Sequence, residues 1–313
     1  MGKSTSPNAA QPASRPAFRT PESEAAFFAA YDAALACWPL PVTPIDAPSE
    51  YGTTRINACG PEGGRPVVLL HGGGATSTVW YANVAALAAS RRVYAVDLIG
   101  DAGRSVHDGR PIKRADDVTG WLDHVLDHLG LDSTALVGHS YGGWIALTYA
   151  LHARHRVEQL ALLDPNLCFA GYRPSYLLRA LPMLVRPTVD RCNAFLDWET
   201  GGALDRGLVD PAWSRVYALG MTDFPSARPV TGPRPSAEQL RSLTTPSLVL
   251  MAERSRAHKS AQVADRARRL LPNAEVTVLS GISHHAAPMA DPVPLNDRLT
   301  RFLGSTGRSA PDA

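Results

Sequence analysis

The chain has 313 residues, of which 45% are hydrophobic and 19% are charged, and its formal net charge is +2. This composition is typical of a globular protein and excludes a largely disordered one. The small net charge argues against a nucleic-acid-binding surface or a polybasic membrane patch. At this length the chain is large enough for one α/β domain that carries an insertion.

The four cysteines predict neither a metal site nor a disulfide framework. None belongs to a C-x-x-C pair, and none has a histidine nearby at the spacing of zinc ligands. The sequence contains no apolar run of about 20 residues, the length that a membrane-spanning helix needs. The N-terminal residues lack the apolar core of a secretion signal. We therefore expect a cytoplasmic protein with reduced cysteines, no metal and no membrane partner.

In chain order, a Ser-, Pro- and Ala-rich segment at 1–22 predicts a disordered tail. A helix is expected over Pro21–Trp38, and a proline-rich connector follows at Pro39–Pro44. Short apolar runs then predict strands at Thr53–Ala58, Pro66–Leu70, Arg92–Leu98, Thr134–Gly138, Gln159–Leu163, Ser247–Met251 and Glu275–Leu279. Helical patterns separate them at Trp80–Ser90, Ala115–Leu129, Gly143–His152 and Ser260–Leu271. Strands that alternate with helices of this length indicate a mostly parallel sheet.

The alternation stops between 166 and 242. This segment holds many prolines, glycines and aromatic residues but no run that resembles a strand. Because a structureless loop of this length is rare in a compact domain, we expect a mostly helical cap. The predicted division is a core at 23–165 and 243–306, a cap at 166–242 and a second disordered tail at 307–313.

The strongest motif is G-x-S-x-G at Gly138–Gly142, between an apolar strand and an amphipathic helix. A strand that turns at once into a helix holds Ser140 in a strained conformation above the sheet and at a helix N-terminus, where negative charge is favoured. Ser140 is therefore the predicted nucleophile. A Gly-rich turn that contains a serine by chance is the alternative interpretation.

Two further segments supply partners for this serine. The strand before His71 ends in H-G-G-G, which predicts an oxyanion hole formed by the backbone N–H groups of Gly73 and Tyr141. Late in the chain, the spacing from Gly281 favours His284 as the general base, and His285 is then a neighbour that lines the pocket.

In this order the three motifs are similar to those of the α/β-hydrolase superfamily. The stretches Cys37–Pro39, Ser77–Asn83 and Tyr94–Asp101 resemble bacterial carboxylesterases that split naproxen esters. The resemblance runs from Glu22 to Leu303 and is weakest in the cap. It implies an α/β-hydrolase fold with a helical cap, a serine nucleophile and no cofactor.

The resemblance fails at the third member of the expected catalytic triad. Those esterases carry a glutamate after the strand that matches Ser247–Met251, but the position that lines up best here is Ser255. They carry a serine after the preceding strand, where this chain has Asp164. We expect Asp164 to be the acid. Glu253 is the alternative acid, and a further interpretation gives Asp164 only a turn-capping role.

We therefore expect a hydrolase that cleaves a carboxylic ester of a small molecule through an acyl-enzyme. An acyltransferase, thioesterase or cyclase would use the same machinery with a different acceptor, and a non-catalytic binding module is a third alternative. Trp80, Phe169 and His285 are predicted to line the substrate pocket. The sequence does not indicate an oligomeric state.

Overall fold

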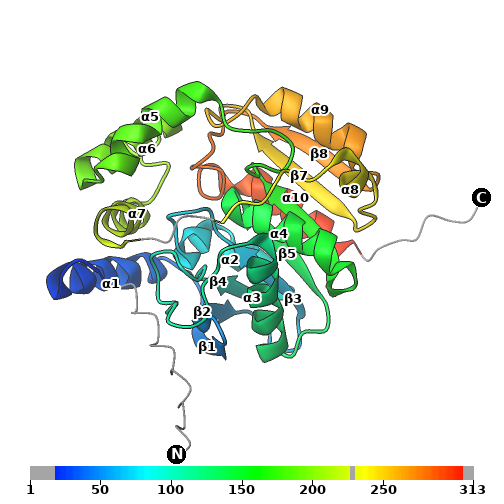
Figure 1. Ribbon diagram of the computed structural model, residues 1–313, viewed down its shortest axis with the longest axis horizontal. Coiled ribbons are helices and arrows are strands. Elements are labelled where there is room, and N and C mark those ends of the chain that lie inside the picture. Colours follow the sequence, from blue (N-terminus) through cyan, green and yellow to red (C-terminus); the bar gives the residue numbers. More distant parts are fainter. Residues whose placement is uncertain (1–17, 226–229, 306–313) are drawn as a thin grey trace, which may run out of the picture.

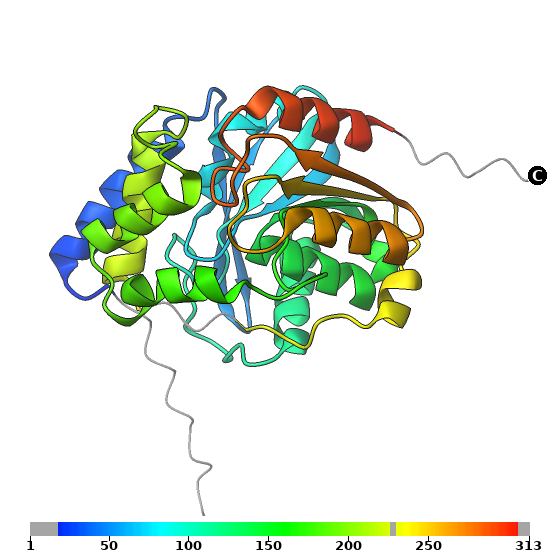
Figure 2. The same cartoon turned by 90° about the horizontal axis from the view of Figure 1, so that it is seen from above.

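The computed structural model describes residues 18–225 and 230–305. This part of the chain forms an eight-stranded sheet with helices on both faces (Figures 1 and 2). The strand order is β1-β2-β4-β3-β5-β6-β7-β8, and the strands from β4 to β8 in that order are parallel. β1 and β2 pair antiparallel with their neighbours. The predicted mostly parallel sheet is therefore confirmed.

Every strand predicted from the sequence is present, with ends that differ by two residues at most. They are β2 Gly52–Cys59, β3 Arg65–Leu70, β4 Arg91–Val96, β5 Thr134–His139, β6 Val157–Leu163, β7 Ser247–Ala252 and β8 Ala274–Leu279. The sequence reading missed β1, Thr43–Ser49, which overlaps the predicted connector. Pro44 and Pro48 obscured this strand, and the structure accommodates them because β1 lies at the edge of the sheet.

The predicted helices occur as α1 Pro21–Leu35, α3 Ala115–His128, α4 Tyr141–His152 and α9 Ser260–Leu270. The helix expected over Trp80–Ser90 is instead a 3₁₀ turn, η1 Ser77–Ala82, followed by the short α2, Val84–Ala88. Two elements were not predicted, η2 Arg154–Arg156 and α10 Pro292–Gly304, whereas α8 Ala237–Arg241 lies within the segment predicted to be mostly helical.

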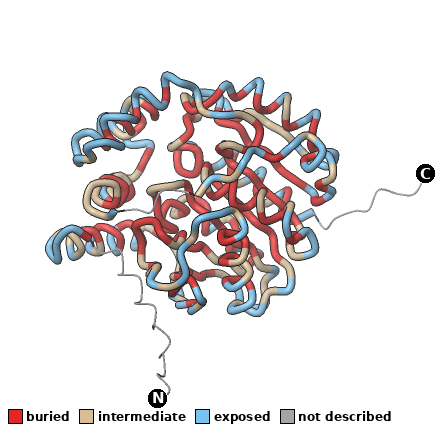
Figure 3. Tube along the Cα trace, in the orientation of Figure 1, coloured by how far each residue is buried: buried red, intermediate tan, exposed pale blue. Residues whose placement is uncertain are grey.

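Alternate residues of the buried strands supply two separate cores. In β3, Val67 and Leu69 face the layer of α2 and α10, whereas Val68 and Leu70 face α3, α4 and α9. This split follows from the two-residue period of a strand and leaves β3 apolar on both faces. Figure 3 shows the resulting buried centre, with exposed residues on the outer sides of the helices.

Three helices between β6 and β7 lie beside the sheet: α5 Pro174–Val185, α6 Val189–Thr200 and α7 Pro211–Asp223 (Figure 1). They fall inside the range predicted for the cap, and we refer to them as the cap helices. α8 also falls in that range, but its Leu240 packs in the core that contains α9. The exact division into core and cap remains a prediction.

The N-terminal helix, α1, packs against the cap helices, since its Phe27 lies in one hydrophobic cluster with Val216 of α7. The folded chain begins earlier than expected. Phe18 is buried, and Thr20 caps α1 through the backbone N–H of Ser23. The predicted tail at 1–22 is therefore wrong for residues 18–22. Its remainder, 1–17, and the predicted tail at 307–313 lie outside the described residues.

The turn from β5 into α4 passes so close to β3 that it has no room for side chains. A Cβ atom on Gly142 would lie 2.2 Å from the Leu70 carbonyl oxygen and 2.5 Å from that of His71. A Cβ atom on Gly138 would lie 2.3 Å from the Gly142 carbonyl oxygen. The obstacles are backbone atoms at the end of β3 and in the first turn of α4, so they have little freedom to move.

We expect Gly142→Ala to lower the free energy of unfolding by about 3 kcal/mol or more, because overpacking against fixed backbone forces the sheet to shift. Urea unfolding followed by circular dichroism measures this loss. Gly63→Ala is the matched control, since a Cβ atom there has no neighbour within 4 Å. Equal stability of the two variants would contradict the close crossing.

Candidate active site

The site lies at the edge of the sheet where parallel strands end. Ser140 follows β5, Asp164 follows β6 and His284 lies in the segment after β8, while Gly73 follows β3. In an open α/β sheet this edge is where ligands bind. The fold therefore brings together residues that are up to 211 positions apart, from Gly73 to His284.

Ser140 occupies the strained turn predicted for a nucleophile elbow. Its φ is 54° and its ψ is −114°, a conformation that non-glycine residues rarely adopt. The Ser140 hydroxyl lies 2.9 Å from Nε2 of His284 and can donate a hydrogen bond to it. The Nδ2 group of Asn166 donates a second hydrogen bond, of 2.6 Å, to Ser140 Oγ.

Asp164 is fully buried and accepts three hydrogen bonds. Nδ1 of His284 donates to Oδ2 over 2.6 Å, while Nε2 of His258 and the backbone N–H of Ala252 each donate to Oδ1 over 2.9 Å. Burial opposes the charge, but the two histidines outweigh it and hold the pKa of Asp164 well below its usual range. The structure thus places an ionised carboxylate behind the His284 ring.

Glu253, the alternative acid, points elsewhere. Its carboxylate is exposed and accepts hydrogen bonds from Ser280 Oγ and the backbone N–H of Gly281, at 2.9 and 2.8 Å. Ser255, at the position that lined up with the esterase glutamate, is buried. The contact with His284 is therefore made from β6 by Asp164 and not from the loop after β7.

The two predicted oxyanion-hole residues lie next to each other. A Cβ atom on Gly73 would be 3.8 Å from the Cβ of Tyr141, an ordinary contact. Tyr141 is fixed by stacking of its ring on Trp144 and by a 3.0 Å hydrogen bond from its hydroxyl to the Val230 carbonyl. Its backbone N–H is at the first position of α4, where helical amides have no partner within the helix.

Ser140 and His284 open into a cavity of about 640 Å³ between the sheet edge and the cap helices. Gly73, Tyr141 and His285 also line it. The cap side is rich in aromatic residues, namely Tyr172, Tyr176, Phe195 and Tyr217, with Phe224 just after α7. A mainly apolar cavity with a few polar groups is typical of a small-molecule site.

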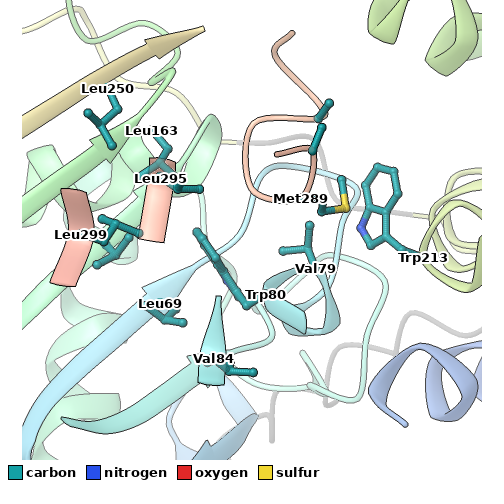
Figure 4. Packing of buried hydrophobic residues seen from close by; sticks show 14 of the residues in the cluster. Leu69, Val79, Trp80, Val84, Leu163, Trp213, Leu250, Met289, Leu295 and Leu299 are labelled. Carbon is teal, nitrogen blue, oxygen red and sulfur yellow. The ribbon is translucent and has the colours of Figure 1, made fainter. Parts of the chain in front are cut away.

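Two residues predicted to line the pocket do not lie there. Trp80 is fully buried beneath the sheet edge, where it packs with Leu69 and Leu299 (Figure 4). Phe169 is also buried, in the core that contains α4 and α9. Both predictions are wrong because large apolar residues beside a catalytic motif serve the core as readily as the pocket. His285 does line the cavity.

Sequence reasoning missed three polar residues near the site: Asn166, His258 and Glu199. His258 comes from the loop after β7, and Glu199 comes from α6. Glu199 is buried and accepts hydrogen bonds from the backbone N–H groups of His284 and His285. No local motif marks these residues, because their contacts form only when distant segments pack. For Asn166, its position two residues after Asp164 was an available signal.

Among the residues that the structure describes, no group of three or more His, Cys, Asp or Glu is arranged to hold a metal ion. In the same residues, no helix is long and apolar enough to cross a membrane.

The buried charge of Glu199 predicts a loss of stability in acid. Burial would raise its pKa, but hydrogen bonds and charge from His285 and His284 lower it from 4.5 to about 2. A carboxyl group whose pKa is depressed by folding adds stability above its unfolded pKa and loses it as the pH falls toward the folded value. The window is therefore about pH 4.5 to 2, and the contribution is roughly 3 kcal/mol.

We expect Glu199→Gln to be less stable than the wild type at about pH 6, and this difference to shrink by about pH 3. Urea unfolding of both proteins at each pH measures the difference. A difference that stays constant over this range would show that Glu199 is not selectively stabilised in its charged form.

Comparison with known proteins places the chain in a family. The sequence pattern of the alpha/beta hydrolase family matches residues 67–298, well over half of the chain. Two relatives from Bacillus subtilis (strain 168) are each 29% identical. The carboxylesterase nap, described as uncharacterized, aligns with 89% of this chain and 92% of its own length. For the carboxylesterase YbfK these shares are 91% and 96%.

Solved structures give the same result. The structure of naproxen esterase from Bacillus subtilis is similar with a TM-score of 0.84 and 27% identity, over 91% of this chain and 99% of that one. The structure of carboxylesterase CesB (YbfK) from the same organism has the same TM-score and identity, over 91% of this chain and all of that one. With its sheet order, its strained serine and these matches together, this chain belongs to the alpha/beta hydrolase family.

Proposed function

We propose that this protein is a serine carboxylesterase that cleaves an ester of a small organic molecule through an acyl-enzyme. The observation that carries the proposal is the chain of hydrogen bonds from Asp164 through His284 to Ser140, of which His284 and Ser140 line a mainly apolar cavity. The similarity to two carboxylesterases over nearly their whole length supports the same reaction.

In the first half of the reaction, Ser140 Oγ attacks the ester carbonyl and its proton passes to Nε2 of His284. The hydrogen bond of 2.9 Å between these atoms is short enough for direct transfer. The ionised Asp164 holds the ring by Nδ1 and stabilises the imidazolium that forms. The negative oxygen of the tetrahedral intermediate is expected to accept hydrogen bonds from the N–H groups of Gly73 and Tyr141.

The imidazolium then gives its proton to the departing alcohol as the carbon–oxygen bond breaks, which leaves the acyl group on Ser140. In the second half a water molecule loses a proton to His284 and attacks the acyl carbon. The same proton returns to Ser140 Oγ when the acid leaves. Each half therefore begins and ends with a neutral imidazole.

The cavity favours an ester whose acyl part is apolar or aromatic. Aromatic side chains of α5, α6 and α7 line the side that faces the cap, and most of the cavity surface is apolar. One relative of known structure is named as a naproxen esterase. We therefore propose arylpropionate esters as the first substrates to test, beside p-nitrophenyl esters of short acids.

We expect Ser140→Ala to lose all labelling by a fluorophosphonate and to keep less than about one percent of esterase activity. Intact-mass measurement of the labelled protein reports the adduct, and p-nitrophenolate release reports turnover. Substantial hydrolysis by a folded Ser140→Ala protein would move the nucleophile to another residue.

A second comparison tests the acid. Asp164→Asn removes the charge behind His284 and is expected to cost up to about ten-thousand-fold in turnover, because the ring loses its orientation and its stabilised cation. Glu253→Gln changes an exposed carboxylate that is hydrogen-bonded to Ser280 and Gly281, so its turnover is expected to stay near that of the wild type. Both variants must first be shown to fold. The reverse pattern would assign the acid to Glu253.

A further inference from the structure

Glu199 brings a second carboxylate to the segment that carries the base, and it comes from the cap instead of the core. It lies at the end of α6, and its side chain is fully buried. Oε1 accepts a hydrogen bond of 3.1 Å from the backbone N–H of His284. Oε2 accepts hydrogen bonds from the backbone N–H and from Nδ1 of His285, at 2.9 and 3.2 Å.

These contacts complete a clamp on the main chain of His284. Glu199 holds its N–H group, and Nε2 of His139, at the end of β5, donates a 2.9 Å hydrogen bond to its carbonyl oxygen. The His284 ring is fixed independently by Asp164 and Ser140. The N–H group of Ala287 also donates to the His284 carbonyl, over 3.3 Å. One of these five attachments comes from a cap helix, so a shift of α6 would move the segment that carries the ring.

The charge of Glu199 has no strong cation to neutralise it. Within the described ranges, its salt-bridge partner is His285, and no lysine or arginine lies within 4.0 Å. A buried carboxylate whose ion-pair partner is a single histidine favours any further positive charge that forms nearby. During the reaction a positive charge forms on the imidazole of His284, one residue from His285, the ion-pair partner of Glu199.

Other groups also face the His284 ring and must be weighed. Asp164 contacts Nδ1, while the rings of His139, His258 and His285 have their centroids 5.2, 6.1 and 5.1 Å from it. Tyr176 of α5 approaches its face, with centroids 6.4 Å apart. Two carboxylates therefore contact His284. Asp164 binds its ring, whereas Glu199 binds its backbone N–H group.

We propose that Glu199 is a positioning residue through which the cap controls the base: it fixes the backbone of His284 and His285 and stabilises the imidazolium formed at His284 during acyl transfer. The inference rests on the proposed function, because it assigns His284 the role of base. Full reactivity of Ser140 then requires α6 to stay in the position in which Glu199 contacts His284 and His285. A cap that moves away would withdraw both the anchor and the charge.

The test is the rate of Ser140 labelling by a fluorophosphonate as a function of pH, in the full-length protein. This rate reports the Ser140–His284 pair without requiring the right ester. For Glu199→Gln we expect the plateau rate to fall by roughly tenfold, since the base is less well held. We also expect the acidic limb to move to lower pH by about one unit, because loss of a facing negative charge favours the neutral ring.

Two variants separate charge from shape. Glu199→Asp keeps the charge on a shorter side chain, so its acidic limb is expected to stay near the wild-type position although the plateau falls. Glu253→Gln is the matched control: it removes an exposed carboxylate that binds Gly281, three residues before His284, and should change neither quantity.

An acidic limb that stays at the wild-type pH in Glu199→Gln would overturn the proposal, whatever the plateau, because a purely structural role lowers the rate at every pH alike. A wild-type protein that is not labelled at all would instead refute the proposed function. The two failures are therefore distinguishable in one experiment.

Discussion

The site depends on one buried charge, the carboxylate of Asp164. An ion removed from water costs several kcal/mol unless hydrogen bonds and opposite charge replace its hydration. Here both oxygens are occupied, one by His284 and the other by His258 together with the backbone N–H of Ala252. These donors come from two loops beyond β7 and β8 and from the end of β7 itself. The carboxylate thus joins the ends of three adjacent strands, and the orientation of His284 toward Ser140 follows from it.

In this arrangement the carboxylate that contacts His284 follows β6. The esterases that the sequence resembles are expected to place their acid in the loop after β7. Asp164 adopts a positive φ of 40°, a conformation that aspartate tolerates better than most residues, and its side chain turns toward the neighbouring loop. That loop supplies His258 as a donor in place of a carboxylate, while Ser255 occupies the aligned position. Glu199 then adds a contact from the cap on the opposite side of the same segment.

The parts that were predictable from the sequence are those encoded by neighbouring residues. The Gly138–Gly142 turn is recognisable from its five-residue motif, although the obstacle to a side chain at Gly142 is the distant backbone of Leu70 and His71. The buried parallel strands follow from continuous apolar runs. β1 was hidden by its prolines, which are tolerated at an edge strand that the sequence alone does not identify. His258 and Glu199 could not be found, because their roles depend on loops meeting at one sheet edge across 94 and 85 positions, respectively, from Asp164 and His284. Trp80 and Phe169 were misplaced because local sequence does not distinguish a side chain that lines a cavity from one beneath it.

The most direct test of the account is a crystal structure of the protein after reaction with a phosphonate ester that mimics the tetrahedral intermediate. The account predicts phosphorus bonded to Ser140 Oγ, with a phosphonyl oxygen facing the N–H groups of Gly73 and Tyr141. It also predicts Nδ1 of His284 on Asp164, with His258 still on the other oxygen. A His284 ring turned toward Glu253, or a phosphonyl group on another residue, would contradict the central claim that the Asp164 carboxylate organises this active site.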